Sequence, residues 1–397
     1  MDRSEATEMD FRMDAAGEDF RSEVQAFLDE HLTEDVVMAA HDTGTVHNWD
    51  LHKAMADAGY TRASWPREFG GDERDPFEMS ALSSELQLRH APMDGYSTTM
   101  MICNTLRHVG TAAQQRDIIP RALDGEILIC LGYSEPDSGS DVASVATRAV
   151  RDGDEWVING QKMFTTLAQE ADYVFMLTRT NTEVAKHKGL TMFLVPMSSP
   201  GIEIQPVHTL GGERTNITFY TDVRVDDSMR VGGIDEGWRA MTVALTFERG
   251  GSMMGQSIRL VRLVEKWAAT TIASNGRPWI EDPLVRERLA RANMLNNAGE
   301  LLGLRNVYLA HVGELPGVEG SMAKLFSSER FVGICEDLID MLGPLGLLQH
   351  GEVDAPVDGW VEQAMRHSVV TTIYGGTSEV QRGIVAERGL GLPRSRG

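Results

Sequence analysis

Cysteine is scarce in this sequence. Cys103, Cys130 and Cys335 are the three cysteines among 397 residues, an odd number at wide spacing. That pattern argues against a disulfide framework and predicts reduced thiols in a folded core. The sequence also lacks any run of about 18 apolar residues, so we expect no membrane-spanning helix. Residues 1–10 are acidic and contain no apolar segment. This argues against a secretory signal or an arginine-rich transit peptide, and it favours a cytoplasmic protein.

Basic residues are few as well. Lys and Arg together number 37 against 59 Asp and Glu, which gives a formal net charge of −22. A surface that is so acidic repels phosphate backbones and argues against nucleic-acid and anionic-membrane partners. The sequence contains no P-loop, no GxGxxG and no HExxH or cysteine-paired spacing, so neither a nicotinamide cofactor nor a metal site is predicted. An apolar content of 42% over 397 residues is instead typical of a globular protein with two or three domains.

Three zones of different hydrophobic periodicity divide the chain. In the first zone, Phe20, Val24 and Leu28 fall on one face of an amphipathic helix. From residue 127 short apolar runs alternate with turn residues, and Asn159-Gly160 is a strong hairpin signal. The helical period then returns, and it predicts helices over 238–272, 283–312, 322–342 and 357–373. The order predicts a multi-domain α+β chain with an N-terminal helical domain (1–126), a small antiparallel β-barrel or sandwich (127–233) and a C-terminal helical bundle (234–397).

Three short segments are candidates for the functional site. Residues 132–141 read GYSEPDSGSD, a hydroxyl-rich turn with backbone N–H groups that can meet a polar ligand. Residues 159–166 read NGQKMFTT, and residues 373–382 read IYGGTSEVQR. Taken singly, the hydroxyls in them are more typical of local turn hydrogen bonds than of ligand contacts. Together and in this order, the segments resemble the signatures of the acyl-CoA dehydrogenase family.

The resemblance extends over nearly the whole chain, including the order of helical and β zones. It implies a tetramer in which FAD lies between the β domain and the C-terminal helices. It further implies that Ser134 hydrogen-bonds the pyrimidine edge of the flavin, with Tyr133 beside it in the cofactor site. Thr166 matches the hydroxyl that faces flavin N5, and Phe164 takes the place of the usual tryptophan beside the ring.

Other FAD and substrate contacts are implied in the same way. Ser140 matches a residue that touches the pantetheine arm of the acyl-CoA, while Thr377 and Glu379 match contacts of the C-terminal loop to FAD. Gly343 begins a turn similar to the one that reaches the adenosine part of FAD in a neighbouring subunit, although the next residue is Pro where Gly is usual. The family's Arg before a Phe-Gly pair is replaced by NGRPW. Arg277 is therefore either a pyrophosphate clamp or an exposed loop arginine.

The residue after Tyr374 decides how the chemistry is assigned. In the commonest family signature it is the Glu that removes the substrate's α-proton, and here it is Gly375, which keeps the backbone N–H that holds the thioester carbonyl. Long-chain and isovaleryl members instead carry their base as a Glu directly before an Arg on the first long C-terminal helix. Glu248-Arg249 matches that pattern, which implies Glu248 as base and Arg249 near the CoA arm. The alternative is that Glu248 lies on a solvated face and pairs with a nearby arginine.

The predicted function is the FAD-dependent α,β-desaturation of an acyl-CoA, with electrons passed to an electron-transferring flavoprotein. The exchange of Gly375 and Glu248, with the C-terminal GLGLPR, also resembles actinobacterial members that act on sterol side-chain thioesters. Some of these pair with a related chain, so a homotetramer and a heterotetramer are both open. Two alternatives are a non-catalytic partner subunit and a flavin oxidase or monooxygenase on the same fold.

Overall fold

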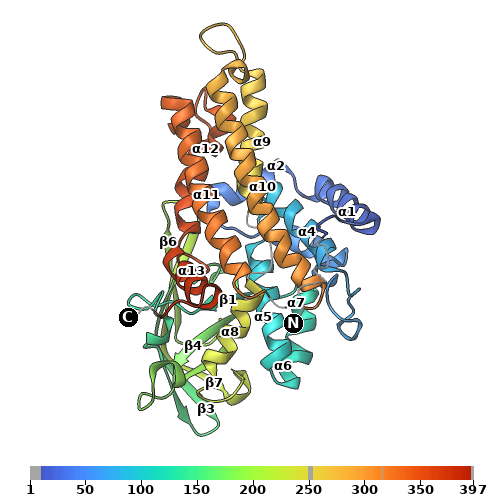
Figure 1. The fold of residues 1–397 in the computed structure, drawn as a ribbon. Helices are drawn as coiled ribbons and strands as arrows, with labels where there is room; N and C mark the ends of the chain where they lie inside the picture. Colours follow the sequence, from blue (N-terminus) through green and yellow to red (C-terminus); the bar gives the residue numbers. More distant parts are fainter. Residues whose placement is uncertain (1–9, 249–253, 315, 395–397) are drawn as a thin grey trace. The chain divides into compact units, whose positions relative to one another are not determined.

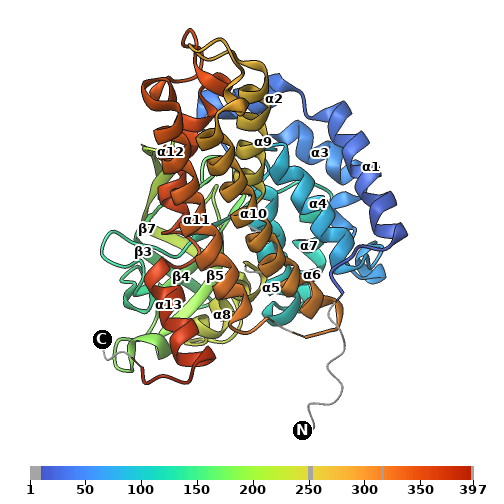
Figure 2. The same cartoon turned by 45° about the horizontal axis from the view of Figure 1, so that its top comes forward.

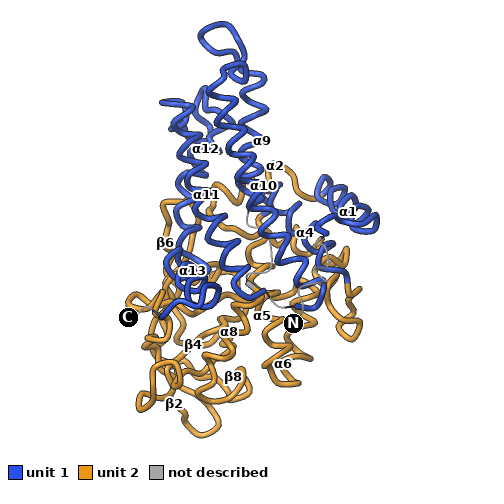
Figure 3. Tube along the Cα trace, in the orientation of Figure 1, with its two compact units in different colours: residues 1–30, 74–91, 249–397 blue, residues 31–73, 92–248 orange. Residues whose placement is uncertain are grey.

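The computed structural model describes residues 10–248, 254–314 and 316–394. The chain groups into two compact units, which are coloured separately in Figure 3. The first unit comprises residues 1–30, 74–91 and 249–397, and the second comprises residues 31–73 and 92–248. Each unit thus combines segments that are distant in the sequence. The three predicted domains, 1–126, 127–233 and 234–397, stay a prediction.

The first unit is built from helices. Their bounds are α1 (Ala15–His31), α4 (Pro76–Leu88), α9 (Gly255–Thr270), α10 (Pro283–His311), α11 (Glu319–Leu342), α12 (Trp360–Thr371) and α13 (Ser378–Ile384). In both views α10 and α11 run side by side, and α12 lies next to α11 (Figure 1, Figure 2). Buried side chains from α9, α10, α11 and α12, among them Leu260, Leu289 and Phe331, form one apolar cluster. Burial of this shared apolar surface holds the helices together.

Local sequence explains where two of these helices begin. Asp75 and Glu78 form a reciprocal capping box at the start of α4. At α10 the Asp282 carboxylate accepts a hydrogen bond from the backbone N–H of Leu284 at 2.8 Å. Pro283 occupies the first turn, where its missing N–H costs nothing. These residues satisfy N–H groups that have no partner inside the helix, and they fix the starting points.

The single long helix predicted over 238–272 is wrong. Helix α8 (Gly237–Glu248) ends at Glu248, and α9 begins at Gly255 directly after the non-helical Met254. Residues 249–253 themselves lie outside the described residues. The other predicted helices, 283–312, 322–342 and 357–373, correspond to α10, α11 and α12.

The second unit contains an eight-stranded sheet with helices. The strands are β1 (Ile129–Gly132), β2 (Arg148–Asp152), β3 (Glu155–Met163), β4 (Tyr173–Arg179), β5 (Leu190–Pro196), β6 (Ile202–His208), β7 (Arg214–Asp226) and β8 (Arg230–Val231). The helices are α2 (Glu34–Thr43), α3 (Trp49–Asp57), α5 (Asp94–Val109), α6 (Ala112–Asp117), α7 (Ile119–Leu123) and α8. The sheet order is β6-β7-β3-β2-β4-β5-β8, and β1 pairs with β4. Apart from the parallel β1–β4 and β2–β4 contacts the pairing is antiparallel, which confirms the predicted α+β fold class.

The hairpin predicted at Asn159-Gly160 is wrong, because β3 continues through both residues. The turn that joins β2 to β3 lies earlier, at Gly153. The register of β3 against β7 shifts between Ile158 and Gly160, as at a β-bulge. A Cβ on Gly160 would lie 2.6 Å from the Thr147 hydroxyl oxygen, so close backbone approach accounts for the glycine.

Strand β4 shows how the sheet is buried on both faces. Phe175 and Leu177 belong to the apolar cluster that includes side chains of α5 and α8. Val174 and Met176 point to the opposite face and join a second cluster within the sheet. The predicted burial of the cysteines is confirmed, since Cys103, Cys130 and Cys335 are buried free thiols. No helix in the described part of the chain is long and apolar enough to cross a membrane.

Candidate functional site

The turn that follows β1 is held closed by its own backbone. Glu135 and Ser138 exchange two backbone hydrogen bonds, at 2.8 Å and 3.1 Å. The Ser134 carbonyl accepts a hydrogen bond from the Met163 N–H at 2.9 Å, which ties the turn to the end of β3. The turn and the end of β3, two of the three segments singled out in the sequence, are therefore neighbours in the second unit.

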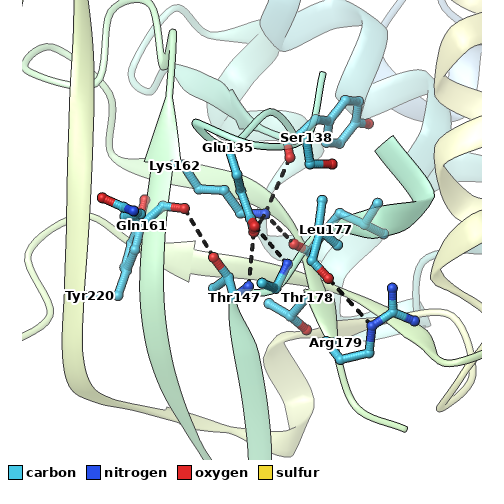
Figure 4. A network of polar contacts seen from close by, with 12 residues as sticks. Glu135, Ser138, Thr147, Gln161, Lys162, Leu177, Thr178, Arg179 and Tyr220 are labelled. Atoms are coloured by element: carbon cyan, nitrogen blue, oxygen red, sulfur yellow. Dashed lines mark hydrogen bonds and ion pairs between the residues drawn. The ribbon is translucent and has the colours of Figure 1, made fainter. Parts of the chain in front are cut away.

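A buried ion pair between Lys162 and Glu135 lies beneath the contact of this turn with β3 (Figure 4). The Lys162 ammonium donates to Glu135 Oε1 at 2.8 Å, to the Leu177 carbonyl at 2.7 Å and to the Tyr133 carbonyl at 3.3 Å. The Glu135 carboxylate also accepts backbone N–H groups, from Ala146 at 2.6 Å and Thr147 at 2.9 Å. The pair thus connects β3, β4, the turn after β1 and the segment before β2.

Both members of this pair are charged at neutral pH. Burial raises the pKa of Glu135, but the Lys162 ammonium and the hydrogen bonds to the carboxylate lower it more, so that the net shift is downward. Burial lowers the pKa of Lys162 to about 8, and Glu135 opposes that shift. A carboxylate that accepts from an ammonium and two backbone N–H groups has most of its acceptor sites occupied, which suits a structural role rather than proton transfer.

Phe164 and Thr166 follow β3 and lie at the surface of the unit. The Phe164 side chain is 58% exposed, although it is aromatic, and its φ is +60°. A left-handed backbone is unfavourable for a residue with a Cβ, and such strain concentrates at functional sites. Thr166 is exposed, and its hydroxyl lies 3.0 Å from that of Thr215. An exposed aromatic face beside hydroxyls suits a planar ring with polar edges, which is the chemistry of a flavin.

The other predicted site residues of the second unit, Tyr133, Ser134 and Ser140, lie on the turn that follows β1. Tyr133 is half-buried against the apolar cluster of α5 and α8, with its ring centroid 6.2 Å from that of Phe175. Ser134 is also half-buried, and Ser140 is exposed at the end of the turn. The hydrogen bond between Met163 and Ser134 therefore brings together the two segments that carry Tyr133, Ser134, Phe164 and Thr166. Their contacts with a cofactor stay predictions, as does the substrate contact of Ser140.

Three predicted site residues of the first unit lie on the loop between α12 and α13 and in the first turn of α13. Gly375 adopts φ +63° and Gly376 φ +86°, both in the left-handed region that favours glycine. Thr377 is the N-cap of α13, and its hydroxyl accepts the Val380 N–H at 3.3 Å. Glu379 is exposed and lies 3.6 Å from Arg382. The Thr377 hydroxyl therefore has a structural function as a helix cap, in addition to its predicted contact with FAD.

The segments that carry Arg277 and Gly343 border one cavity of about 890 Å³ in the first unit. Its lining includes Trp267 and Trp279 and three carboxylates, those of Asp282, Asp340 and Asp354. Gly343 caps α11 and begins the short helical turn η7 (Gly343–Leu347). The Arg277 guanidinium lies 3.2 Å from Glu281, and its side chain is 70% exposed. Arg288 also lines the cavity, but it forms an ion pair with Asp340 at 2.6 Å. The remaining carboxylates oppose a pyrophosphate, and the role of Arg277 as its clamp stays a prediction.

The proposed base and its neighbour are placed only in part. Glu248 is the last residue of α8 and belongs to the second unit. Arg249 lies outside the described residues. Gly375 belongs to the first unit. The assignments of Glu248, Gly375 and Arg249 therefore stay predictions.

Comparison with known proteins places the chain in a class of oxidoreductases. Family models match along nearly its whole length: "Acyl-CoA dehydrogenase, N-terminal domain" over residues 15–126, "middle domain" over 130–227 and "C-terminal domain" over 235–390. "Acyl-CoA dehydrogenase IpdE1" of Mycobacterium tuberculosis is 37% identical over 396 residues, which cover 95% of this chain and 98% of that protein. "Acyl-CoA dehydrogenase FadE26" of the same organism is 35% identical, with 90% and 91% covered.

Solved structures agree with this assignment. The chain is similar to the "Tcur3481-Tcur3483 steroid ACAD", with 34% identity, a TM-score of 0.89 and coverage of 98% of this chain and 100% of that one. The ChsE4-ChsE5 complex of Mycobacterium tuberculosis gives 33% identity and a TM-score of 0.90, with 98% and 100% covered. The chain belongs to the acyl-CoA dehydrogenase family.

Sequence reasoning missed three residues that shape the site. It quoted Lys162 within a motif but gave it no role, and it gave none to Lys324 or Gln381. The signal for Lys162 is a lysine at an inward-facing position of an alternating strand, where a buried anion is required. Lys324 and Gln381 carry no comparable signal. Lys324 donates to a carbonyl that is distant in the sequence, and the contact of Gln381 with the Gly375 carbonyl depends on how the loop folds.

Proposed function

We propose that this chain is an FAD-dependent acyl-CoA dehydrogenase that introduces an α,β double bond into the acyl group of a CoA thioester. The observation that carries the proposal is the junction of Ser134, Phe164 and Thr166. It presents an exposed, conformationally strained aromatic and nearby hydroxyls on a rigid support. FAD, when bound, supplies the acceptor for the hydride that leaves the β-carbon. Phe164 would pack beside the flavin ring, and Ser134 and Thr166 would hydrogen-bond its polar atoms.

The chain's own residues activate the substrate. The α-C–H of a thioester is a very weak acid, so fixed donors must polarise the carbonyl while a carboxylate takes the proton. The backbone N–H of Gly375 is the proposed donor, and the Glu248 carboxylate is the proposed base. The proton passes from the α-carbon to Glu248, and the electron pair of that C–H bond forms the new double bond. Arg249 and Ser140 bind the CoA and pantetheine part.

The acyl group that we propose is a bulky one, such as a CoA thioester on a sterol side chain. Two observations support it. Residue 375 is a glycine and has no side chain, and a similar solved structure is described as a steroid ACAD. Electrons then pass to an electron-transferring flavoprotein. The active assembly is a tetramer, and the two-chain composition of the similar complexes favours a related partner chain.

The test is anaerobic mixing of the purified flavoprotein with straight-chain, branched and steroid acyl-CoAs while flavin bleaching is followed. We expect the steroid thioesters to bleach the flavin fastest. Glu248→Gln should slow bleaching by about 10²–10⁴-fold, the usual contribution of a general base. Glu236→Gln is the matched control, because Glu236 is an exposed carboxylate just before the start of the same helix.

Each result separates one part of the proposal from the others. Bleaching of Glu248→Gln at the wild-type rate would show that another residue is the base. An absence of bleaching with every acyl-CoA would reject the dehydrogenase function. Fastest bleaching with short straight chains would reject the bulky substrate. FAD that is retained only after co-expression with a related chain would establish the heteromeric assembly, and retention by the chain alone would reject it.

A further inference from the structure

The loop that contains Gly375 holds two consecutive glycines in left-handed conformation. Gly375 and Gly376 have φ of +63° and +86°. Glycine has the greatest backbone freedom of any residue, so such a pair is a poor place for a donor that must be fixed in direction. In the described structure each of the two carbonyls accepts a side-chain donor. Gln381 Nε2 donates to the Gly375 carbonyl at 2.7 Å, and Lys324 Nζ donates to the Gly376 carbonyl at 2.8 Å.

Both donors are buried and come from helices. Gln381 is fully buried on α13, one turn after the cap at Thr377. Lys324 is 4% exposed on α11, where a hydrogen bond from an ammonium is stronger than in water. An ion pair between Arg382 and Glu329 joins the same two helices at the surface. The donors are therefore fixed by packing before they act on the loop.

The fit between Gln381 and the loop is close. A Cβ built on Gly376 would lie 2.8 Å from Gln381 Nε2, which is too short for an ordinary contact. A glycine at 376 therefore lets the amide approach the loop. Because a peptide group is planar, a carbonyl that is held in place also fixes the N–H of the next residue. Gln381 and Lys324 thus fix the two successive peptide planes that follow Gly375. The Gly375 N–H belongs to the plane before it, between Tyr374 and Gly375. That plane is restricted from both sides, because the Tyr374 N–H donates to the Val370 carbonyl at 3.2 Å and the Gly375 carbonyl is held by Gln381.

We propose that Gln381 and Lys324 are positioning residues, which keep the Gly375 N–H aimed at the thioester carbonyl. This inference rests on the proposed function, in which that N–H polarises the carbonyl. Preorganised donors stabilise developing charge because they need no reorganisation during the reaction. Because both positions are glycines, the loop backbone restricts its own conformation little, and contacts from residues outside the loop must hold it in place. Lys324 and Gln381 supply it without touching the substrate.

The test compares Gln381→Met and Lys324→Met with Arg382→Met in the full-length flavoprotein. Arg382→Met is the matched control, because it breaks a contact between the same two helices without touching either loop carbonyl. The first readout is amide hydrogen exchange of residues 374–378 without substrate. We expect roughly five- to tenfold faster exchange in the first two variants, the effect of losing one net hydrogen bond, and no change in the control.

The second readout is the carbonyl stretching frequency of a bound enoyl-CoA, followed by the rate of flavin reduction. We expect a smaller carbonyl shift and about 10- to 100-fold slower reduction, less than the 10²–10³ for outright loss of a donor. Lys324→Arg, which keeps a cationic donor, should restore most of the rate. Wild-type carbonyl shifts and rates in both Met variants would overturn the proposal.

The proposed function and the positioning role of Gln381 and Lys324 can be rejected separately. If no acyl-CoA reduces the wild-type flavin, the proposed function is wrong, and unchanged exchange in the Met variants would still reject the positioning role. If Lys324→Met does not fold, the variants Gln381→Met and Gln381→Glu test the positioning role instead. Both remove an amide donor of similar size, so both should show the faster exchange and the smaller carbonyl shift. Wild-type values in these two variants reject the proposal.

Discussion

The Lys162 ammonium lies 2.8 Å from the Glu135 carboxylate in the interior of the second unit, with no exposed surface on the lysine. The same ammonium donates to the carbonyl of Tyr133, the residue next to Ser134. Removing one member of such a pair leaves an uncompensated buried charge. The pair therefore links the stability of the sheet to the position of the turn that is proposed to face the flavin.

We expect Lys162→Met to destabilise the protein by about 3–5 kcal/mol, since the Glu135 carboxylate remains buried without its counterion. Urea unfolding of the flavin-free protein measures this loss. Lys186→Met is the matched control, because Lys186 forms an exposed ion pair with Asp141 at 2.5 Å, and its loss should cost under about 1 kcal/mol. Equal effects of the two substitutions would contradict the role given to the buried pair.

Phe164 should affect the cofactor more than the fold. Its side chain is 58% exposed at φ +60°, so Phe164→Gly removes little packing and relieves about 1 kcal/mol of backbone strain. We expect flavin-free protein of unchanged or slightly higher stability, together with faster release of FAD, measured by the rise of flavin fluorescence. Val150→Ala, at an equally exposed strand position with 56% exposure, should change neither quantity. Retention of FAD at the wild-type rate by Phe164→Gly would remove Phe164 from the site.

Two histidines predict acid sensitivity of the second unit. His47 and His52 are 7% and 0% exposed, their ring centroids are 5.1 Å apart, and their ring nitrogens have no hydrogen-bond partner in the described structure. Burial lowers the pKa of His47 to about 3, with His52 adding to the shift, and burial lowers that of His52 to about 4, with Lys53 adding to it. The other rings around the pair belong to Trp49 and Tyr96. Both imidazoles are therefore neutral in the folded protein at neutral pH.

The sign of the effect follows from proton binding. Between about pH 6.5 and the folded pKa values the unfolded chain binds more protons, so stability is full above pH 6.5 and is lost as the pH falls toward 3–4. At pH 5 each histidine lowers the free energy of unfolding by roughly 2 kcal/mol. His52→Leu should flatten the decline in urea stability between pH 7 and 5, whereas substitution of the exposed His187 by Gln should leave it unchanged. An equally steep decline in His52→Leu would exclude the buried pair as its cause.

Periodicity in the sequence predicted the long helices α10, α11 and α12 and the change from helical to β zones, because periodicity depends on local order along the chain. The site residues that the motifs indicate stay predictions. The fold of NGQKMFTT was predicted less well. Asn159-Gly160 lies within β3, at a bulge where Thr147 approaches the backbone closely. Asn and Gly are typical of turns as well as of such bulges, so the pair does not distinguish them. The Lys162–Glu135 pair was also not predicted. It depends on β3 and the turn after β1 meeting in space, and periodicity does not report such contacts.

Gly375 gives the sharpest test of the proposed substrate. Gly375→Ala keeps the backbone N–H but places a methyl group at φ +63°, where strain costs about 1–2 kcal/mol, so some loss of thermal stability is expected. Gly383→Ala is the matched control, because Gly383 lies in α13 and a Cβ there would meet nothing within 4 Å, so it should stabilise the helix by up to about 1 kcal/mol.

If the missing side chain makes room for a bulky acyl group, Gly375→Ala lowers kcat/KM for a steroid acyl-CoA well beyond its effect on butyryl-CoA. Steady-state kinetics with the two thioesters measures the ratio. An equal loss on both substrates would mean that the methyl group disturbs the loop alone, and that Gly375 does not set the size of the acyl group.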